Sequence, residues 1–187
     1  MHSLIAERLM GRPMDTFISE WMERGHILEE EAGKYYAFQN DCDPQPVGFI
    51  TTDDGKIGCS PDRLVGDEGL LEIKAPAAHT HVGYLFGKGA DKKYMPQIQG
   101  QLFVCGPSRK WVDIMSYHPE LPEITIRTER DESYIEMLSE AVTAFAAELH
   151  EKYAEIIERI GDRPVGEARL EARFEKVRQL ITSNQGE

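Results

Sequence analysis

Two strand-like runs joined by a short turn, at residues 56–65 and 70–75, constrain the fold more than any other feature of the sequence. The connection Gly66–Gly69 is polar and has glycine at both ends, which is typical of a hairpin turn. A three-residue loop pairs Val65 with Gly69 and fixes which residues face each other along both strands. We therefore expect an antiparallel hairpin at the centre of a sheet.

Counting back along this hairpin places Asp62 directly opposite Glu72, with Cβ atoms about 4.5–5.5 Å apart. Two carboxylates that close repel each other unless a cation separates them, and Mg²⁺ or Mn²⁺ prefers oxygen ligands of this kind. Lys74 shares a strand face with Glu72, and the carbonyl of Ile73 offers another oxygen. The set suits metal-assisted phosphodiester hydrolysis. A surface hairpin with a Lys–Glu ion pair is the alternative, and a two- or four-residue loop would turn Glu72 to the opposite face.

The rest of the chain changes between helical and strand periods and predicts a single domain over residues 1–187. We expect helices at 3–10, 14–37 (with a break at Gly25), 95–106 (opened by Pro96), 131–160 and 170–181, and further strands at 47–52, 110–118 and 123–129. Residues 77–93 predict a loop, either without helix or with a single helical turn. An apolar stripe along 135–160 predicts core packing. The fold class is α/β in the mixed (α+β) sense: a central mixed sheet flanked by helices, with a C-terminal helical extension at about 131–187.

Composition limits the function classes. Hydrophobic residues make up 41% and charged residues 29%, which is typical of a globular protein. No apolar run reaches the roughly 18 residues that span a membrane, so we expect no membrane partner. The net charge of −12 argues against a general nucleic-acid coat protein but permits an enzyme that binds DNA locally. Cys42, Cys59 and Cys105 form no CxxC pair, which argues against a disulfide framework or zinc site and fits a cytoplasmic setting.

Four blocks of sequence, in order, resemble the phage lambda exonuclease family, also called YqaJ-type viral recombinases. These blocks are Gly25–Ala32, Ser60–Asp62, Leu71–Pro76 and Tyr94–Leu102, and the resemblance covers about residues 4–160. Pro61-Asp62 followed by Glu72-Ile73-Lys74 is similar to the PD-(D/E)xK nuclease signature. The resemblance implies a restriction-endonuclease-like core.

The resemblance also implies roles for individual residues. The metal ligands would be Asp62, Glu72 and the carbonyl of Ile73, and the catalytic groups would be Lys74, Glu29 and Gln97. Glu30 and Glu31 are rivals to Glu29, because neighbours on a helix point about 100° apart and only one or two of them can face the sheet. We expect Gln99 and Gln101 to be packing or surface residues, and Arg63 to point away from Asp62 in a structural role.

Candidate DNA-binding residues lie outside this centre. Met22 precedes Gly25 by three residues, where the family places an apolar wedge between bases, although a helical methionine also suits a core. Lys88, Lys92 and Lys93 form a basic patch suited to phosphate contacts, or alternatively to solubility.

The family's activity is 5′→3′ digestion of one strand of linear double-stranded DNA to mononucleotides, which leaves a 3′ overhang for single-strand annealing. The resemblance implies a Mg²⁺ cofactor with two ions per site and Mn²⁺ as a substitute, a homotrimeric ring around DNA ends, a single-strand annealing protein as partner, and a phage origin with action in the bacterial cytoplasm. An endonuclease with the same core and a non-catalytic DNA-binding assembly factor for an annealing protein are the alternatives.

The family usually carries an N-terminal segment that supplies an arginine to a 5′-phosphate pocket. The sequence begins at the helices that follow this segment in the family. We therefore assign 5′-phosphate recognition to no residue.

Overall fold

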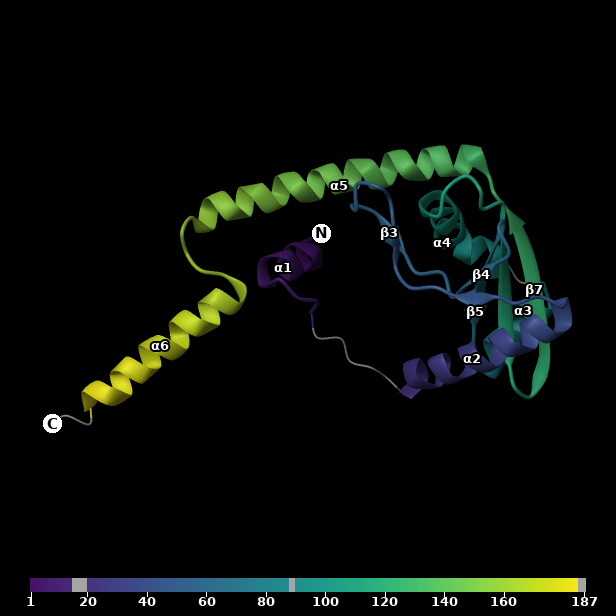
Figure 1. The fold of residues 1–187 in the computed structure, drawn as a ribbon, viewed down its shortest axis with the longest axis horizontal. Coiled ribbons are helices and arrows are strands. Elements are labelled where there is room, and N and C mark those ends of the chain that lie inside the picture. The colour runs from purple at the N-terminus through teal and green to yellow at the C-terminus, as the bar shows by residue number, and fades with distance from the viewer. Residues whose placement is uncertain (15–19, 88–89, 185–187) are drawn as a thin grey trace. The chain divides into compact units, whose positions relative to one another are not determined.

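The computed structural model describes residues 1–14, 20–87 and 90–184 and divides into two compact units (Figure 1). The sheet unit is Ile18–Val142, and the helical unit combines Met1–Phe17 with Thr143–Glu187. Among the described residues, no helix has both the length and the apolar character that crossing a membrane requires. A single domain over the whole chain stays a prediction.

The sheet unit contains a five-stranded mixed sheet, which confirms the predicted fold class. Its strand order is β1 (Gln45–Pro46), β4 (Arg63–Val65), β5 (Gly69–Lys74), β6 (Trp111–His118) and β7 (Leu121–Glu129). The β5 and β6 strands are parallel, and the other neighbours are antiparallel. A separate two-stranded sheet joins β2 (Ile50–Thr51) to β3 (Gly58–Cys59).

Two helices pack on opposite faces of this sheet. Successive strand residues point to opposite faces, so Leu71 and Ile73 of β5 pack with residues of α2 (Glu20–Asn40), whereas Leu70 packs with residues of α4 (Ala90–Val104). By the same alternation, Glu72 and Lys74 lie on the α4 face. Burial of the apolar residues on both faces therefore fixes the direction in which the charged residues of β5 point.

Three local expectations were wrong. The α2 helix runs through Gly25 without a break. Residues 77–93 contain the helix α3 (Ala78–Leu85) and the start of α4, which places Pro96 inside a helix and not at its start. An internal proline removes one helical hydrogen bond, but Ile98 and Leu102 beyond it are fully buried against the sheet. Packing thus outweighs the local penalty.

The helical unit contains α1 (His2–Met10), α6 (Gly166–Asn184) and the second half of α5 (Glu132–Ile160), which begins in the sheet unit. The Arg8 guanidinium lies 4.8 Å from the centre of the Tyr153 ring. The predicted stripe on α5 is not a continuous core, because Ile135 is buried but Phe145 remains 41% exposed. The long terminal helices therefore keep exposed apolar side chains, among them Phe174 and Val177 of α6.

Candidate active site

The β4–β5 hairpin has the predicted register, with Val65 paired to Gly69. The ladder ends where Arg63 pairs with Leu71, one residue before Asp62 would face Glu72. Instead of a further ladder bond, Asp62 Oδ2 accepts a 2.6 Å hydrogen bond from the Ile73 backbone amide. The side chain of Asp62 is thus fixed at the point where the two strands separate.

Glu72 is the buried acid of the site, with 3% of its side chain exposed. Lys74 Nζ forms an ion pair with Oε1 of Glu72, and Gln97 Nε2 donates to the same oxygen at 2.6 Å. Gln101 Nε2 donates to Oε2 at 2.7 Å. Three donors from one strand and one helix therefore hold the Glu72 carboxylate in a single orientation.

The acids are crowded enough to shift the proton affinity of Asp62. Burial, together with the negative charges of Glu72 and Glu29, raises the pKa of Asp62 from 3.8 to about 7. The Ile73 amide and the Lys74 ammonium oppose this shift but do not cancel it. A carboxyl with such a pKa marks a place where positive charge is in deficit.

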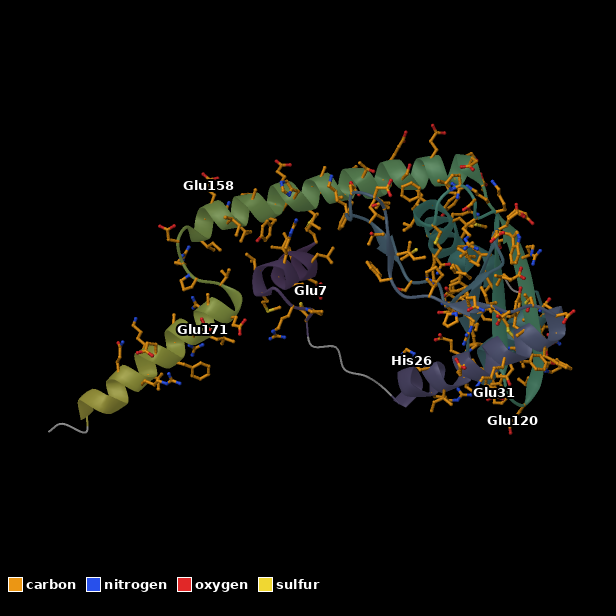
Figure 2. The ribbon with its side chains drawn as sticks, in the orientation of Figure 1. Glu7, His26, Glu31, Glu120, Glu158 and Glu171 are labelled. Carbon is orange, nitrogen blue, oxygen red and sulfur yellow. The ribbon has the colours of Figure 1, made fainter. Side chains whose placement is uncertain are left out.

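The three consecutive glutamates of α2 point in three different directions. Glu30 Oε2 accepts a 2.6 Å hydrogen bond from Arg63, and Glu31 accepts one of 2.6 Å from the Tyr117 hydroxyl. Glu29 instead lines a pocket of about 250 Å³, together with Gly25, His26, Ile73, Lys74 and Ala75. Figure 2 labels His26 and Glu31, which precede and follow Glu29 on the same helix. Glu29 is therefore the glutamate that lines a pocket with Lys74, and its catalytic role stays a prediction.

Arg63 points away from Asp62, as expected, and reaches α2 on the other face of the sheet. Its guanidinium lies so close to Gly33 that a Cβ atom at that position would be 2.4 Å from Nε. Arg63 Nε is buried and has no hydrogen-bond partner among the described residues. The absence of a side chain at Gly33 thus makes room for this ion-paired arginine.

Gln99 and Gln101 of α4 are both buried, and Gln101 makes a contact that was not expected. Gln99 is fully buried and structural, because its side chain bonds to the Glu129 carbonyl and the Asp131 amide. Gln101 was also expected to pack or lie at the surface, yet it contacts Glu72 directly. Within the described part of the chain, Oε1 of Gln101 is buried and accepts no hydrogen bond. Its position four residues after Gln97, on the same side of the helix, was the available signal.

Lys74 has an aromatic neighbour that sequence reasoning missed. Its Nζ lies 5.0 Å from the centre of the Tyr94 ring, and Nζ of Lys93 lies 5.1 Å from the same ring. The Tyr94 hydroxyl is 3.3 Å from that of Tyr84. Aromatic faces attract ammonium groups at such distances, so Tyr94 helps to hold the lysine beside Glu72.

The remaining DNA-binding candidates are only partly described. Lys93 is exposed at the Tyr94 ring. Lys88 lies outside the described residues, as do the side chains of Lys92 and Met22. Their proposed DNA contacts stay predictions.

The end of the hairpin offers a metal ion two carboxylates and one backbone carbonyl as oxygen ligands. In the described part of the chain, no group of three or more His, Cys, Asp or Glu side chains is arranged to hold a metal. Mg²⁺, however, usually binds one or two carboxylates and keeps several waters. Asp62 and Glu72, with the Ile73 carbonyl, meet that smaller requirement.

Known proteins resemble the chain in sequence and in fold. A family model described as the YqaJ-like viral recombinase domain matches residues 3–108. The alkaline exonuclease LHK-Exo from Laribacter hongkongensis is 34% identical, with a TM-score of 0.76 over 84% of this chain and 81% of that one. Its complex with dAMP gives a TM-score of 0.78, again at 34% identity, over 84% of this chain and 82% of that one.

A phage-related exonuclease from Haemophilus somnus 129PT is 16% identical. It has a TM-score of 0.66 over 86% of this chain and 82% of that chain, a likeness of fold alone. No curated protein matches the chain.

Proposed function

The chain belongs to the YqaJ-like viral recombinase family, and from this premise we propose that it is a Mg²⁺-dependent 5′→3′ exonuclease of linear double-stranded DNA. Its similarity to an alkaline exonuclease over most of both chains supports a nuclease. Metal dependence, strand polarity and mononucleotide products are the parts of the proposal that need experiments.

The observation that carries the proposal is the placement of Asp62, Glu72 and Lys74 at one end of the hairpin. The two acids lie close enough for Glu72 to raise the pKa of Asp62, and Lys74 contacts Glu72. A hairpin with only a structural ion pair would not need a second carboxyl beside a buried one, because the repulsion costs stability. The arrangement is therefore better explained by chemistry at this site than by folding.

Asp62, Glu72 and the Ile73 carbonyl would hold the metal, with Mn²⁺ as a substitute for Mg²⁺ and two ions as the proposed occupancy. When bound, the metal would supply a water of lowered pKa and would stabilise charge on the leaving oxygen. The protein must then provide a deprotonated Asp62, because a protonated carboxyl is a poor ligand. Burial and the charges of Glu72 and Glu29 raise the pKa of Asp62, so metal binding at this site would release a proton and would strengthen as pH rises.

Lys74 is the group proposed to act on the reacting phosphate. Its ammonium is held between Glu72 and the Tyr94 ring, so it is oriented before substrate binds. From there it would position the attacking water or stabilise charge on the phosphate oxygens. Glu29, which lines the pocket beside Lys74, would orient that water, and Gln97 would keep Glu72 in place.

The proposed biological setting follows from the family. The substrate would be a DNA end, the assembly a homotrimeric ring, and the partner a single-strand annealing protein, in a phage-infected bacterial cytoplasm. An endonuclease and a non-catalytic assembly factor remain alternatives that one experiment separates.

The test is digestion of a linear duplex that carries a phosphate and a label at one 5′ end. We expect labelled mononucleotide to appear with Mg²⁺, and none with EDTA or with Lys74→Ala. Lys56→Ala, which changes a lysine that is 70% exposed in an ion pair with Asp54, is the matched control and should retain activity. DNA binding by Lys74→Ala should survive.

Other outcomes would replace the proposal. Cleavage of a closed circular duplex would favour an endonuclease. Binding of DNA without hydrolysis in any divalent metal would favour an assembly factor.

A further inference from the structure

The sulfur atoms of Cys59 and Cys105 lie 3.9 Å apart, although the residues are 46 positions apart in the sequence. Cys59 ends β3, and Cys105 directly follows α4. The third cysteine, Cys42, packs against the buried cluster that contains Leu71 on the α2 face of the sheet. Cys105 packs against the buried cluster that contains Leu70 on the α4 face. The fold therefore brings together one particular pair of the three thiols and separates Cys42 from it.

The approach of the two sulfurs rests on contacts of the backbone. Cα atoms of β3 and α4 lie within 8 Å of each other. The Cys105 amide donates a 2.9 Å hydrogen bond to the Gln101 carbonyl, so the residue continues the hydrogen bonding of the helix. Both cysteines are free thiols with partly exposed side chains, which leaves them accessible to a small reagent.

The two thiols differ in their readiness to react. Their mutual hydrogen bond raises the pKa of Cys59 and lowers the pKa of Cys105. The positive charge of Arg109 also favours the Cys105 thiolate, whereas the negative charge of Glu72 disfavours a thiolate at Cys59. Since the thiolate is the nucleophile, Cys105 is suited to react first and Cys59 second.

We propose that Cys59 and Cys105 form a reversible internal disulfide when the folded protein meets a small-molecule disulfide such as oxidised glutathione. The Cys105 thiolate attacks one glutathione sulfur and displaces a glutathione thiolate. Cys59 then gives up its proton and attacks the Cys105 sulfur of the mixed disulfide, which expels the second glutathione thiolate. The protein loses two electrons and two protons, and oxidised glutathione becomes two reduced molecules.

This bond would join two elements that hold the candidate active site. Asp62 follows Cys59 by three residues, and Gln101 precedes Cys105 by four. A disulfide requires the sulfurs to approach to about 2.05 Å, so they would move closer than the 3.9 Å that separates them in the reduced protein. A reducing cytoplasm keeps such cysteine pairs as free thiols, and disulfides that form there are usually transient. The site is thus one of reversible modification, distinct from a permanent structural disulfide.

The test uses the full-length folded protein, oxidised glutathione and intact-mass measurement, followed by alkylation and peptide mapping. We expect the wild type and Cys42→Ser to lose the mass of two hydrogens, to retain no glutathione, and to yield a peptide linked through Cys59 and Cys105. Dithiothreitol should reverse the change. Cys59→Ser should trap glutathione on Cys105 as a stable mixed disulfide.

Several results would overturn the proposal: three free thiols in the treated wild type, mixed disulfides without an internal bond, or a bridge that includes Cys42. The wild type and Cys42→Ser decide the question even if Cys59→Ser folds poorly. The chemistry is measured without DNA, so its failure leaves the proposed nuclease function intact.

Discussion

The backbone amide of Ile73 donates a 2.6 Å hydrogen bond to the carboxylate of Asp62. This bond lies where the β4–β5 ladder has ended, so a side chain occupies the place of a strand carbonyl. Both backbone groups of Ile73 thereby contribute to the candidate site. Its amide orients Asp62, and its carbonyl is one of the proposed metal ligands. Sheet geometry and site geometry are consequently set by the same residue.

Asp62→Asn should change the pH dependence of stability in metal-free protein. The folded state raises the pKa of Asp62 from 3.8 to about 7, so it binds this proton more tightly than the unfolded chain does. The free energy of unfolding should therefore fall as pH rises from about 4 to about 7. Urea unfolding in EDTA across this range should show the fall in the wild type and a flatter profile in Asp62→Asn. Two parallel profiles would contradict the assignment.

Gln101→Leu should impair the site without unfolding the protein. The substitution removes the amide that donates to Glu72 Oε2. The leucine side chain that replaces it is apolar and has a similar volume. Loss of a partner that orients a metal ligand typically costs about 10–100-fold in metal affinity or activity.

The measurement for Gln101→Leu is nuclease rate against Mg²⁺ concentration, with circular dichroism to verify folding. The midpoint should move to higher Mg²⁺. A lower rate at an unchanged midpoint would assign Gln101 a purely structural role.

Glu29→Gln should lower activity, whereas Glu30→Gln should lower stability. Glu29 lines the pocket with Lys74, so its change should lower activity and leave stability nearly unchanged. Glu30 pairs with the buried guanidinium of Arg63, so its change should lower stability and spare the reaction. Paired measurements of kcat and of urea unfolding test this, and loss of activity in Glu30→Gln at full stability would contradict the division.

Gly33→Ala should destabilise the sheet unit. The added Cβ would lie 2.4 Å from Arg63 Nε and 2.8 Å from its Cζ, so the arginine must move. Overpacking of this kind costs about 1–3 kcal/mol. Gly25→Ala on the same helix is the control, because its Cβ would meet nothing within 4 Å.

An alanine at Gly25 should gain stability of up to about 1 kcal/mol from helix propensity. In urea unfolding, the free energy of unfolding should therefore fall in Gly33→Ala and rise in Gly25→Ala. Equal destabilisation would show that the contact between Arg63 and Gly33 has little effect on stability.

The hairpin could be predicted from sequence because its information is local. Turn residues and strand alternation are enough to pair Val65 with Gly69 and to put Glu72 and Lys74 on one face. The long helix after Asp131 has an equally local signal, and α5 begins at Glu132 as expected. Local patterns of this kind hold where no distant contact competes with them.

The failures involve residues whose state depends on distant partners. The local pattern around Pro96 predicts a helix start, yet buried residues beyond it keep α4 continuous on both sides. The contact of Gln101 with Glu72 joins residues 29 positions apart in the sequence. The pairing of Glu30 with Arg63 is likewise invisible until α2 packs on the sheet. The residues that support the acids of the candidate site thus depend on contacts that form only in the folded chain.

The three residues that connect β4 and β5 also limit how the gene can vary. Side chains alternate between sheet faces with a period of two. A codon inserted or deleted between Val65 and Gly69 would therefore exchange the residues that β5 presents to α2 and α4. Glu72 and Lys74 would then meet Leu28 and Ala32, and the apolar residues of β5 would meet Gln97 and Gln101. We expect insertions or deletions of two codons between Val65 and Gly69 to be tolerated. Insertion or deletion of a single codon there should abolish both folding and activity.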